Sequence, residues 1–201
     1  MSIALAHGSV DCPPDRVICL DDPRWSRLHH IVDTHSLLRG EFTLASGRSS
    51  NYFFQLRQTT LHPEGAHLIG EIIVEFMQAR AIRCVGGLVQ GAVPLVTAAA
   101  VASYRMDYPI NACFVRKEPK PHGAQELVDG YIIDGSEVLA VDDVTTAGGS
   151  MLKAINSLKR ENDCQVRWGL SIVDRESGAG EMLSRNGVQL VSIFRKSDFS
   201  I

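Results

Sequence analysis

The stretch 138–150, which reads VLAVDDVTTAGGS, constrains the fold of this chain more than any other. It begins with four apolar residues, a run typical of a buried strand in a parallel sheet. The polar and small residues that follow are Asp142, Asp143, Thr145, Thr146, Gly148 and Gly149. Ser150 stands where a helix N-cap is expected, directly before the helical pattern MLKAINSLKR. The stretch therefore predicts a strand, a tight loop and the start of a helix.

This strand, loop and helix are the unit with which α/β folds build anion sites, because loop amides and the helix N-terminus direct N–H donors at a phosphate. A phosphate site does not need two carboxylates, so we expect Asp142 and Asp143 to hold ribose hydroxyls or a magnesium ion beside it. The Walker and Rossmann glycine patterns are both absent. The alternative is an ordinary turn before a capped helix, but such a turn does not require the acidic, threonine and glycine pairs together.

Strand and helix patterns alternate along most of the chain. Strands are expected near 84–87, 112–115, 138–141, 166–173 and 188–194, with helices near 63–80 and 92–105. This alternation predicts an α/β fold with a parallel sheet and right-handed crossovers. Ligands of such sheets bind at the carboxyl ends of the strands, which is where Asp142 and the residues after it are expected.

The N-terminal part precedes this pattern. Residues 1–22 are interpreted as an irregular extension outside the functional core. A helix is expected from Pro23, with Gly40 as its stop, followed by a hairpin. Phe53 and Phe54 are adjacent in the second strand of that hairpin, so their side chains face opposite sides. One is expected to pack on the core, while the other, or its backbone, faces a ligand.

Charge and cysteine content narrow the class of protein. The formal net charge of −3 gives no reason to expect a nucleic-acid partner. The five cysteines are odd in number and lack C-x-x-C spacing, so neither a disulfide framework nor a zinc site is expected. No apolar run approaches the roughly 20 residues of a membrane span, and no signal peptide is expected. These observations favour a cytoplasmic protein.

A basic segment, 116–130, reads RKEPKPHGAQELVDG and fits neither a helical nor a strand period. Its cation-capable residues are Arg116, Lys117, Lys120 and His122. Long loops in compact domains are usually lids or disordered. Because the protein as a whole is acidic, positive charge gathered on one loop suggests closure over an anion, which would exclude water from the site. The alternative is a solvated charged loop, and the nearby phosphate motif favours the lid.

The 138–150 stretch resembles the phosphoribosyl diphosphate (PRPP) signature of the type I phosphoribosyltransferases. The segments FTLASGRSSNYFF, FVRKEPKPHG and VDRESGAG resemble one branch of that family, the orotate phosphoribosyltransferases, in order from about Trp25 onward. The resemblance implies an α/β fold with a parallel sheet flanked by helices, a core of about 61–201 and a small hood of about 23–60. It also implies that phosphoribosyl is transferred from PRPP to orotate, with Mg²⁺, in de novo UMP synthesis.

The resemblance also implies roles for residues at matching positions. Lys120, His122, Asp142 and Asp143 would be catalytic. PRPP would be bound by Arg116, Lys117, Lys120, His122, Asp142, Asp143, Val144, Thr145, Thr146, Ala147, Gly148, Gly149 and Ser150. Orotate would be held by Phe53, Phe54, Thr146 and Arg175, because a guanidinium matches two carboxylate oxygens. Mg²⁺ would be held mainly through PRPP, with Asp142 and Asp143 reached through water.

In this family the basic loop reaches the active site of the neighbouring subunit, which implies a homodimer with shared sites. No nucleic acid or membrane partner is implied. The remaining alternatives for the function are a phosphoribosyltransferase for another base and a non-catalytic PRPP-binding regulator.

Three residues depart from the family pattern or allow a second interpretation. Arg175 has an alternative as a surface residue paired with an adjacent carboxylate. Ala45 and Gln90 stand where many members have lysine, so two positive charges toward PRPP are missing. Arg57, just beyond the hairpin, is a candidate to replace one of them.

Overall fold

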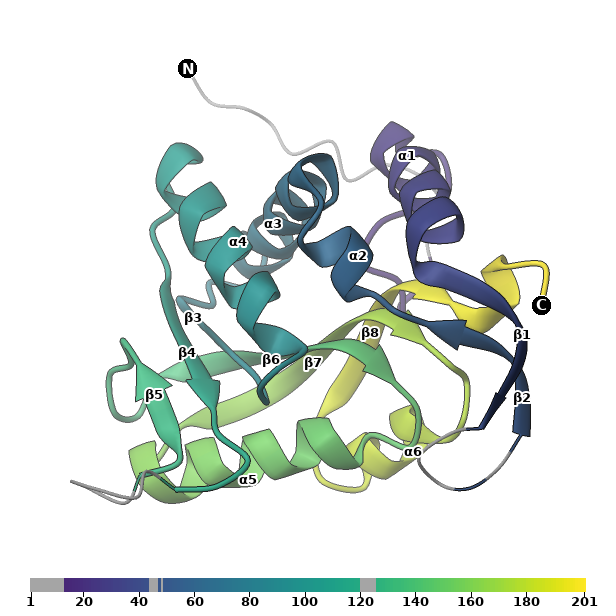
Figure 1. The fold of residues 1–201 in the computed structure, drawn as a ribbon. Coiled ribbons are helices and arrows are strands. Elements are labelled where there is room, and N and C mark those ends of the chain that lie inside the picture. The colour runs from purple at the N-terminus through teal and green to yellow at the C-terminus, as the bar shows by residue number, and fades with distance from the viewer. Residues whose placement is uncertain (1–12, 44–46, 48, 120–125) are drawn as a thin grey trace.

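The computed structural model describes residues 13–43, 47, 49–119 and 126–201, and its centre is a six-stranded sheet in the order β5-β4-β3-β6-β7-β8 (Figure 1). The strands are β3 (Cys84–Gly86), β4 (Asn111–Val115), β5 (Val128–Gly130), β6 (Glu137–Thr145), β7 (Gln165–Asp174) and β8 (Gln189–Arg195). Neighbouring strands are parallel, except that β5 is antiparallel to β4 at one edge. The α/β fold with a mostly parallel sheet is therefore confirmed.

Helices cover both faces of this sheet (Figure 1). On one face lie α3 (Pro63–Gln78) and α4 (Ala92–Arg105), and on the other α5 (Gly149–Asn162) and α6 (Ala179–Ser184). Leu139 and Val141 of β6 belong to the core that contains α3 and α4, whereas Val138 and Ala140 belong to the core that contains α5. Successive side chains of a strand alternate between faces, so a strand covered on both sides must be apolar throughout. This requirement accounts for the VLAV run.

The N-terminal part forms the hairpin that was expected. Its elements are α1 (Pro23–Ile31), η1 (Val32–Ser36), β1 (Leu37–Thr43), β2 (Ser49–Phe54) and the short α2 (Arg57–Thr60). β1 and β2 pair in antiparallel fashion as a separate two-stranded sheet. The helix α2 was not expected from the sequence.

The helix expected from Pro23 to Gly40 is wrong at its C-terminal end. After α1 the backbone continues as the π-helical turn η1, and Leu37 already begins β1. Leu37 pairs with Phe54, which is a contact between distant segments that a local pattern does not contain. Gly40 lies within β1 with a φ of +146°, at an irregularity in the pairing with β2. Gly40 therefore permits the irregular backbone within β1 and does not end a helix.

The last part of the segment 1–22 contacts the core. Arg16 forms a parallel bridge with Ser192, at the free side of β8, and Ile18 is buried in the same core as α3 and α4. Cys19 is disulfide-bonded, which the number and spacing of the cysteines did not indicate. In the described part of the chain, no helix is long and apolar enough to cross a membrane.

Candidate functional site

The acidic pair lies on β6 itself, since the strand continues through Asp142 and Asp143 to Thr145. Pairing with β7 carries the strand this far, with Asp142 opposite Ser171 and Thr145 opposite Asp174. The loop before α5 is therefore shorter than the sequence indicated. Val144 is half-buried and Thr145 is buried, whereas Thr146 and Ala147 are exposed in the loop.

Gly148, and not Ser150 as predicted, is the N-cap of α5. Its φ of +80° favours glycine, and a Cβ at this position would lie 2.7 Å from Cε of Met182. Gly149 and Ser150 are exposed in the first turn of the helix, and no side chain caps it. The first N–H groups of a helix have no partner within it. This N-terminus can therefore direct donors at an anion.

Burial controls the charge of the acidic pair. The backbone N–H of Asp143 donates to Oδ1 of Asp142 at 3.0 Å, and that of Val144 donates to Oδ1 of Asp143 at 2.9 Å. Burial, reinforced by the charge of Asp143, nevertheless raises the pKa of Asp142 to about 7. Burial also raises the pKa of Asp143. Because desolvation penalises the ionised forms, a cation or a set of hydroxyl donors at this point would stabilise the pair.

The loop between β3 and α4 lies directly against these carboxylates. A Cβ added at Gly91 would be 2.5 Å from Oδ1 of Asp143 and 3.0 Å from Oδ1 of Asp142. A Cβ at Gly87 would be 2.1 Å from the carbonyl oxygen of Val141. Both positions must therefore be glycine for the loop to approach β6 this closely. The peptide bond between Val89 and Gln90, in the middle of this loop, is cis.

Arg57, the first residue of α2, reaches the same loop. Its Nη1 donates to Oε1 of Gln90 at 3.4 Å. While burial raises the pKa of Asp143, the charge of Arg57 opposes that shift. A guanidinium on α2 thus acts on the acidic pair from beside Gln90.

Arg175 follows the end of β7, beside the acidic strand. Its backbone N–H donates to the carbonyl oxygen of Thr145 at 2.9 Å, which continues the pairing of β7 with β6. Its guanidinium donates to Oη of Tyr52 from Nη2 at 2.9 Å and from Nε at 3.2 Å. Among the residues that the structure describes, the carboxylates of Asp174 and Glu176 bind other partners. The alternative of a surface ion pair is therefore not what the structure adopts.

The two phenylalanines face opposite sides, as expected. Phe54 is buried and packs edge-to-face on Phe199 with ring centroids 5.3 Å apart. Phe53 is exposed and lies 5.9 Å from the ring of Phe42. Tyr52 shares the inner face with Phe54, and sequence reasoning missed it. An amphipathic tyrosine two residues before an inward phenylalanine is the signal that would have found it.

The basic loop is described only at its two ends, so Lys120 and His122 lie outside the described residues. Arg116 donates to Oδ2 of Asp129 at 2.6 Å, across the base of the loop, and Lys117 is exposed. The expectation of an irregular loop as far as Gly130 is wrong, because β5 pairs with β4 from Val128 onward. The partner strand β4 lies outside the 116–130 segment, so the segment itself carried no local signal of this pairing.

Both ends of this loop are attached to α5. Oε2 of Glu161 accepts from the backbone N–H groups of Leu127 at 2.9 Å and Val128 at 3.1 Å. Nζ of Lys153 donates to the carbonyl oxygen of Lys117 at 3.1 Å. The helix whose N-terminus follows the acidic strand therefore also contacts both described ends of the basic loop.

Comparisons with known proteins identify a matching family and similar sequences and structures within it. Residues 58–192 match the family model of the phosphoribosyl transferase domain. The orotate phosphoribosyltransferase of Rhodopseudomonas palustris (strain TIE-1) is 43% identical over 178 residues, which cover 87% of this chain and 95% of that protein.

Two solved structures of the orotate phosphoribosyltransferase of Mycobacterium tuberculosis H37Rv are also similar to this chain. The complex with Fe(III) dicitrate has a TM-score of 0.79 at 35% identity, covering 89% of this chain and 100% of that one. The complex with PRPP has a TM-score of 0.75 at 33% identity, with the same coverage of both chains.

Proposed function

The chain belongs to the phosphoribosyl transferase family and, within it, to the orotate phosphoribosyltransferases, and from this premise we propose a role for each part of its site. The activity is the transfer of phosphoribosyl from PRPP to orotate in de novo UMP synthesis, giving orotidine 5′-monophosphate and diphosphate. A bond forms from a ring nitrogen of orotate to the anomeric carbon as the bond to diphosphate breaks. The protein must therefore position two substrates and stabilise the departing charge.

The PRPP subsite is built around the end of β6. Asp142 and Asp143 accept hydrogen bonds from the ribose hydroxyls, and the backbone of 144–150 surrounds the 5′-phosphate. The observation that carries this assignment is the α5 N-terminus without a side-chain cap, which follows the buried Asp142 and the half-buried Asp143 by one short loop. Helix N-termini stabilise phosphate groups through their N–H donors and dipole.

The orotate subsite lies beside it, at the end of β7. Arg175 binds the carboxylate of orotate, while Thr146 and the backbone at Phe53 and Phe54 contact the ring. Tyr52 supports this assignment, because its hydroxyl accepts from one side of the guanidinium and leaves further donors for a ligand. The pairing of β6 with β7 keeps the two subsites adjacent.

Magnesium fits the donor set at the acidic pair. Among the described residues, no group of three or more side chains of the His, Cys, Asp or Glu type could hold a metal alone. Mg²⁺ commonly binds one or two carboxylates together with substrate phosphates. Asp142 and Asp143 would therefore hold it jointly with PRPP, partly through water, and it would neutralise charge on the diphosphate. The residues themselves orient the ribose.

The basic loop contributes Arg116, Lys117, Lys120 and His122 to the diphosphate, in the active site of a neighbouring subunit. For Arg116 to do so, its ion pair with Asp129 must open. A homodimer is supported by the exposed apolar side chains Leu61, Val101 and Tyr104 around α3 and α4, since such patches mark interaction surfaces. A cytoplasmic location is part of the proposal, because charged substrates do not cross a lipid layer unaided.

A kinetic experiment tests the role of the loop. Orotate consumption is followed by absorbance with PRPP and Mg²⁺ for the wild type, for Lys120→Ala and for the control Lys159→Ala, an exposed lysine at the far end of α5. Loss of a charge that stabilises the leaving group is expected to lower kcat by about 100-fold or more. The control should retain wild-type rates. A kcat for Lys120→Ala that equals the control would contradict the assignment of the loop.

A further inference from the structure

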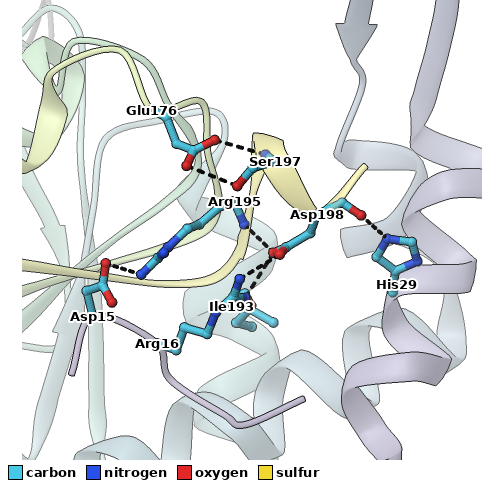
Figure 2. A network of polar contacts seen from close by, with 8 residues as sticks. All are labelled: Asp15, Arg16, His29, Glu176, Ile193, Arg195, Ser197 and Asp198. Atoms are coloured by element: carbon cyan, nitrogen blue, oxygen red, sulfur yellow. Dashed lines mark hydrogen bonds and ion pairs between the residues drawn. The ribbon is translucent and has the colours of Figure 1, made fainter. Parts of the chain in front are cut away.

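Arg175 is followed by a residue in an unusual backbone conformation. Glu176 has a φ of +54°, in the left-handed region that side-chain-bearing residues rarely adopt. Its carboxylate accepts two hydrogen bonds from Ser197, one from the backbone N–H at 2.9 Å and one from Oγ at 3.0 Å (Figure 2). A disfavoured conformation persists only when surrounding contacts hold it. The Glu176–Ser197 contact is such a constraint.

The backbone on the other side of Arg175 is held as well. Oδ1 of Asp174 accepts from the backbone N–H of Glu176 at 3.0 Å and from Oγ1 of Thr145 at 3.4 Å. The hydroxyl of Ser177 donates to the carbonyl oxygen of Arg175 at 3.1 Å. Arg175 thus stands between two anchored residues, so that its Cα has little freedom relative to β6.

The turn that contains Ser197 is itself fixed by a buried ion pair (Figure 2). The turn, η2 (Lys196–Asp198), ends in Asp198, whose carboxylate accepts from Nη1 of Arg16 at 2.9 Å and from the backbone N–H of Arg195 at 2.7 Å. The side chains of Arg16 and Asp198 are only 7% and 11% exposed. The carbonyl of Asp198 is also bonded to His29 Nε2 at 3.0 Å.

Asp15 and Arg195 form a second ion pair beside it (Figure 2). Segments from the beginning of the chain, from α1 and from its C-terminal end therefore meet at one point. Ser197 lies at this point and contacts Glu176, which in turn restrains the backbone at Arg175.

The guanidinium of Arg175 has only a neutral partner in the described part of the chain, Oη of Tyr52. Nε and Nη2 make that contact, so the N–H groups on Nη1 remain for a ligand. A bidentate contact with a carboxylate requires the guanidinium plane to be oriented within a narrow range. Orientation of this kind depends on the backbone at Arg175 as much as on Tyr52.

We propose that the contact of the Glu176 carboxylate with Ser197 positions Arg175 for the carboxylate of orotate, so that Glu176 is a positioning residue for substrate specificity. This inference rests on the assignment of Arg175 to the orotate subsite. Glu176 itself touches no substrate. Its effect is confined to the orotate half of the site, because the PRPP half is carried by β6 and α5.

Steady-state kinetics of Glu176→Ala, Glu176→Gln and Glu176→Gly test the proposal. Glu176→Ala is expected to raise the KM for orotate about tenfold and to leave the KM for PRPP within about twofold of wild type. Glu176→Gln keeps an acceptor oxygen for Ser197 and should restore most of the affinity. Glu176→Gly adopts a positive φ without strain but lacks the carboxylate, and should behave like Glu176→Ala. The control is Glu181→Ala, an exposed carboxylate on α6.

A double-mutant cycle distinguishes positioning of Arg175 from a general structural role of Glu176. In an Arg175→Ala background, Glu176→Ala should cause no further rise in the KM for orotate, since residues that act as a unit are not additive. Inhibition by a pyrimidine that lacks the carboxylate should be unchanged by Glu176→Ala.

Two outcomes would overturn the proposal. One is a Glu176→Gly or Glu176→Ala variant with wild-type KM for orotate. The other is an equal change in both KM values together with a lowered melting temperature. If instead Arg175→Ala itself left the KM for orotate unchanged, the assignment of Arg175 would fail first, and the two failures are thereby distinguished.

Discussion

Asp142 binds its proton more tightly in the folded chain than in the unfolded one, because burial and the charge of Asp143 raise its pKa from 3.8 to about 7. Between these two pH values the unfolded chain releases the proton while the folded chain keeps it. Stability contributed at this residue therefore falls as the pH rises from 3.8 to about 7, and the full penalty remains above that range. The carboxylate that we assign to PRPP therefore destabilises the ligand-free protein.

Because the ionised Asp142 lowers the stability of the fold, Asp142→Asn is predicted to stabilise the ligand-free protein. With a chelator present and without PRPP, the free energy of unfolding at about pH 8 should rise by about 2–4 kcal/mol. At about pH 4 the gain should fall to roughly 0.5 kcal/mol, because the folded carboxyl is then protonated and the unfolded one, with a pKa of 3.8, is only partly ionised. Urea unfolding at the two pH values measures the difference, with the exposed Asp107→Asn as control. A variant no more stable than wild type at the higher pH would contradict the argument.

At the scale of elements, the short helix α2 brings the guanidinium of Arg57 to the loop between β3 and α4. α2 places Arg57 against Gln90, and the glycines of that loop let it approach the acidic pair. We propose that Arg57 of α2 supplies the charge that the loop lacks at position 90.

Arg57→Ala is therefore expected to raise the KM for PRPP about tenfold, because a cation near the diphosphate is lost. The KM for orotate should stay near its wild-type value. Gln90→Lys in the Arg57→Ala background should recover part of the loss, since it restores a charge at the facing position. The exposed Arg39→Ala, on β1, serves as a matched control. An unchanged KM for PRPP in Arg57→Ala would refute the compensation.

The sequence was informative where structure depends on neighbours in the chain. The 138–150 stretch predicted a strand, a phosphate-type loop and a helix, because buried strands and glycine turns carry local signals. It misplaced the N-cap, since pairing with β7 extends β6 to Thr145 and leaves Gly148 as the cap. The end of α1 was lost for a similar reason, because Leu37 is drawn into pairing with Phe54.

The contacts that hold Arg175 could not be predicted in this way. Tyr52 lies 123 positions from Arg175, and the Arg16–Asp198 pair is separated by 182 positions. Such contacts arise only when the sheet and hairpin are assembled, and no spacing rule anticipates them. The roles of individual residues toward PRPP and orotate remain predictions.

At the scale of the whole molecule, the proposal that two subunits share their sites can be tested with mixed subunits. Lys120→Ala and Asp143→Asn should each be nearly inactive alone. If the loop of one subunit completes the site of the other, a heterodimer has one site with both substitutions and one with neither. A random mixture should then recover up to about a quarter of wild-type activity, because half of the dimers carry one intact site.

Co-expression of the two variants with different tags, followed by an activity assay of the mixture, measures this recovery. Lys120→Ala mixed with itself provides the baseline. Activity that stays at the baseline, although heterodimers are isolated by both tags, would show that each loop acts within its own subunit.

Residues 15–17, which pair with the outer side of β8, have a consequence for solubility. The backbone of Val17 donates to Ser192 at 3.0 Å, and that of Ser192 donates to Asp15 at 3.0 Å, so these residues occupy hydrogen-bonding groups at the outer side of the sheet. A strand whose outer groups are unpaired is a template on which a second molecule can add its own strand. By occupying these groups, residues 15–17 protect the edge of the sheet from aggregation. A chain shortened past them would expose β8 to pairing with a second molecule.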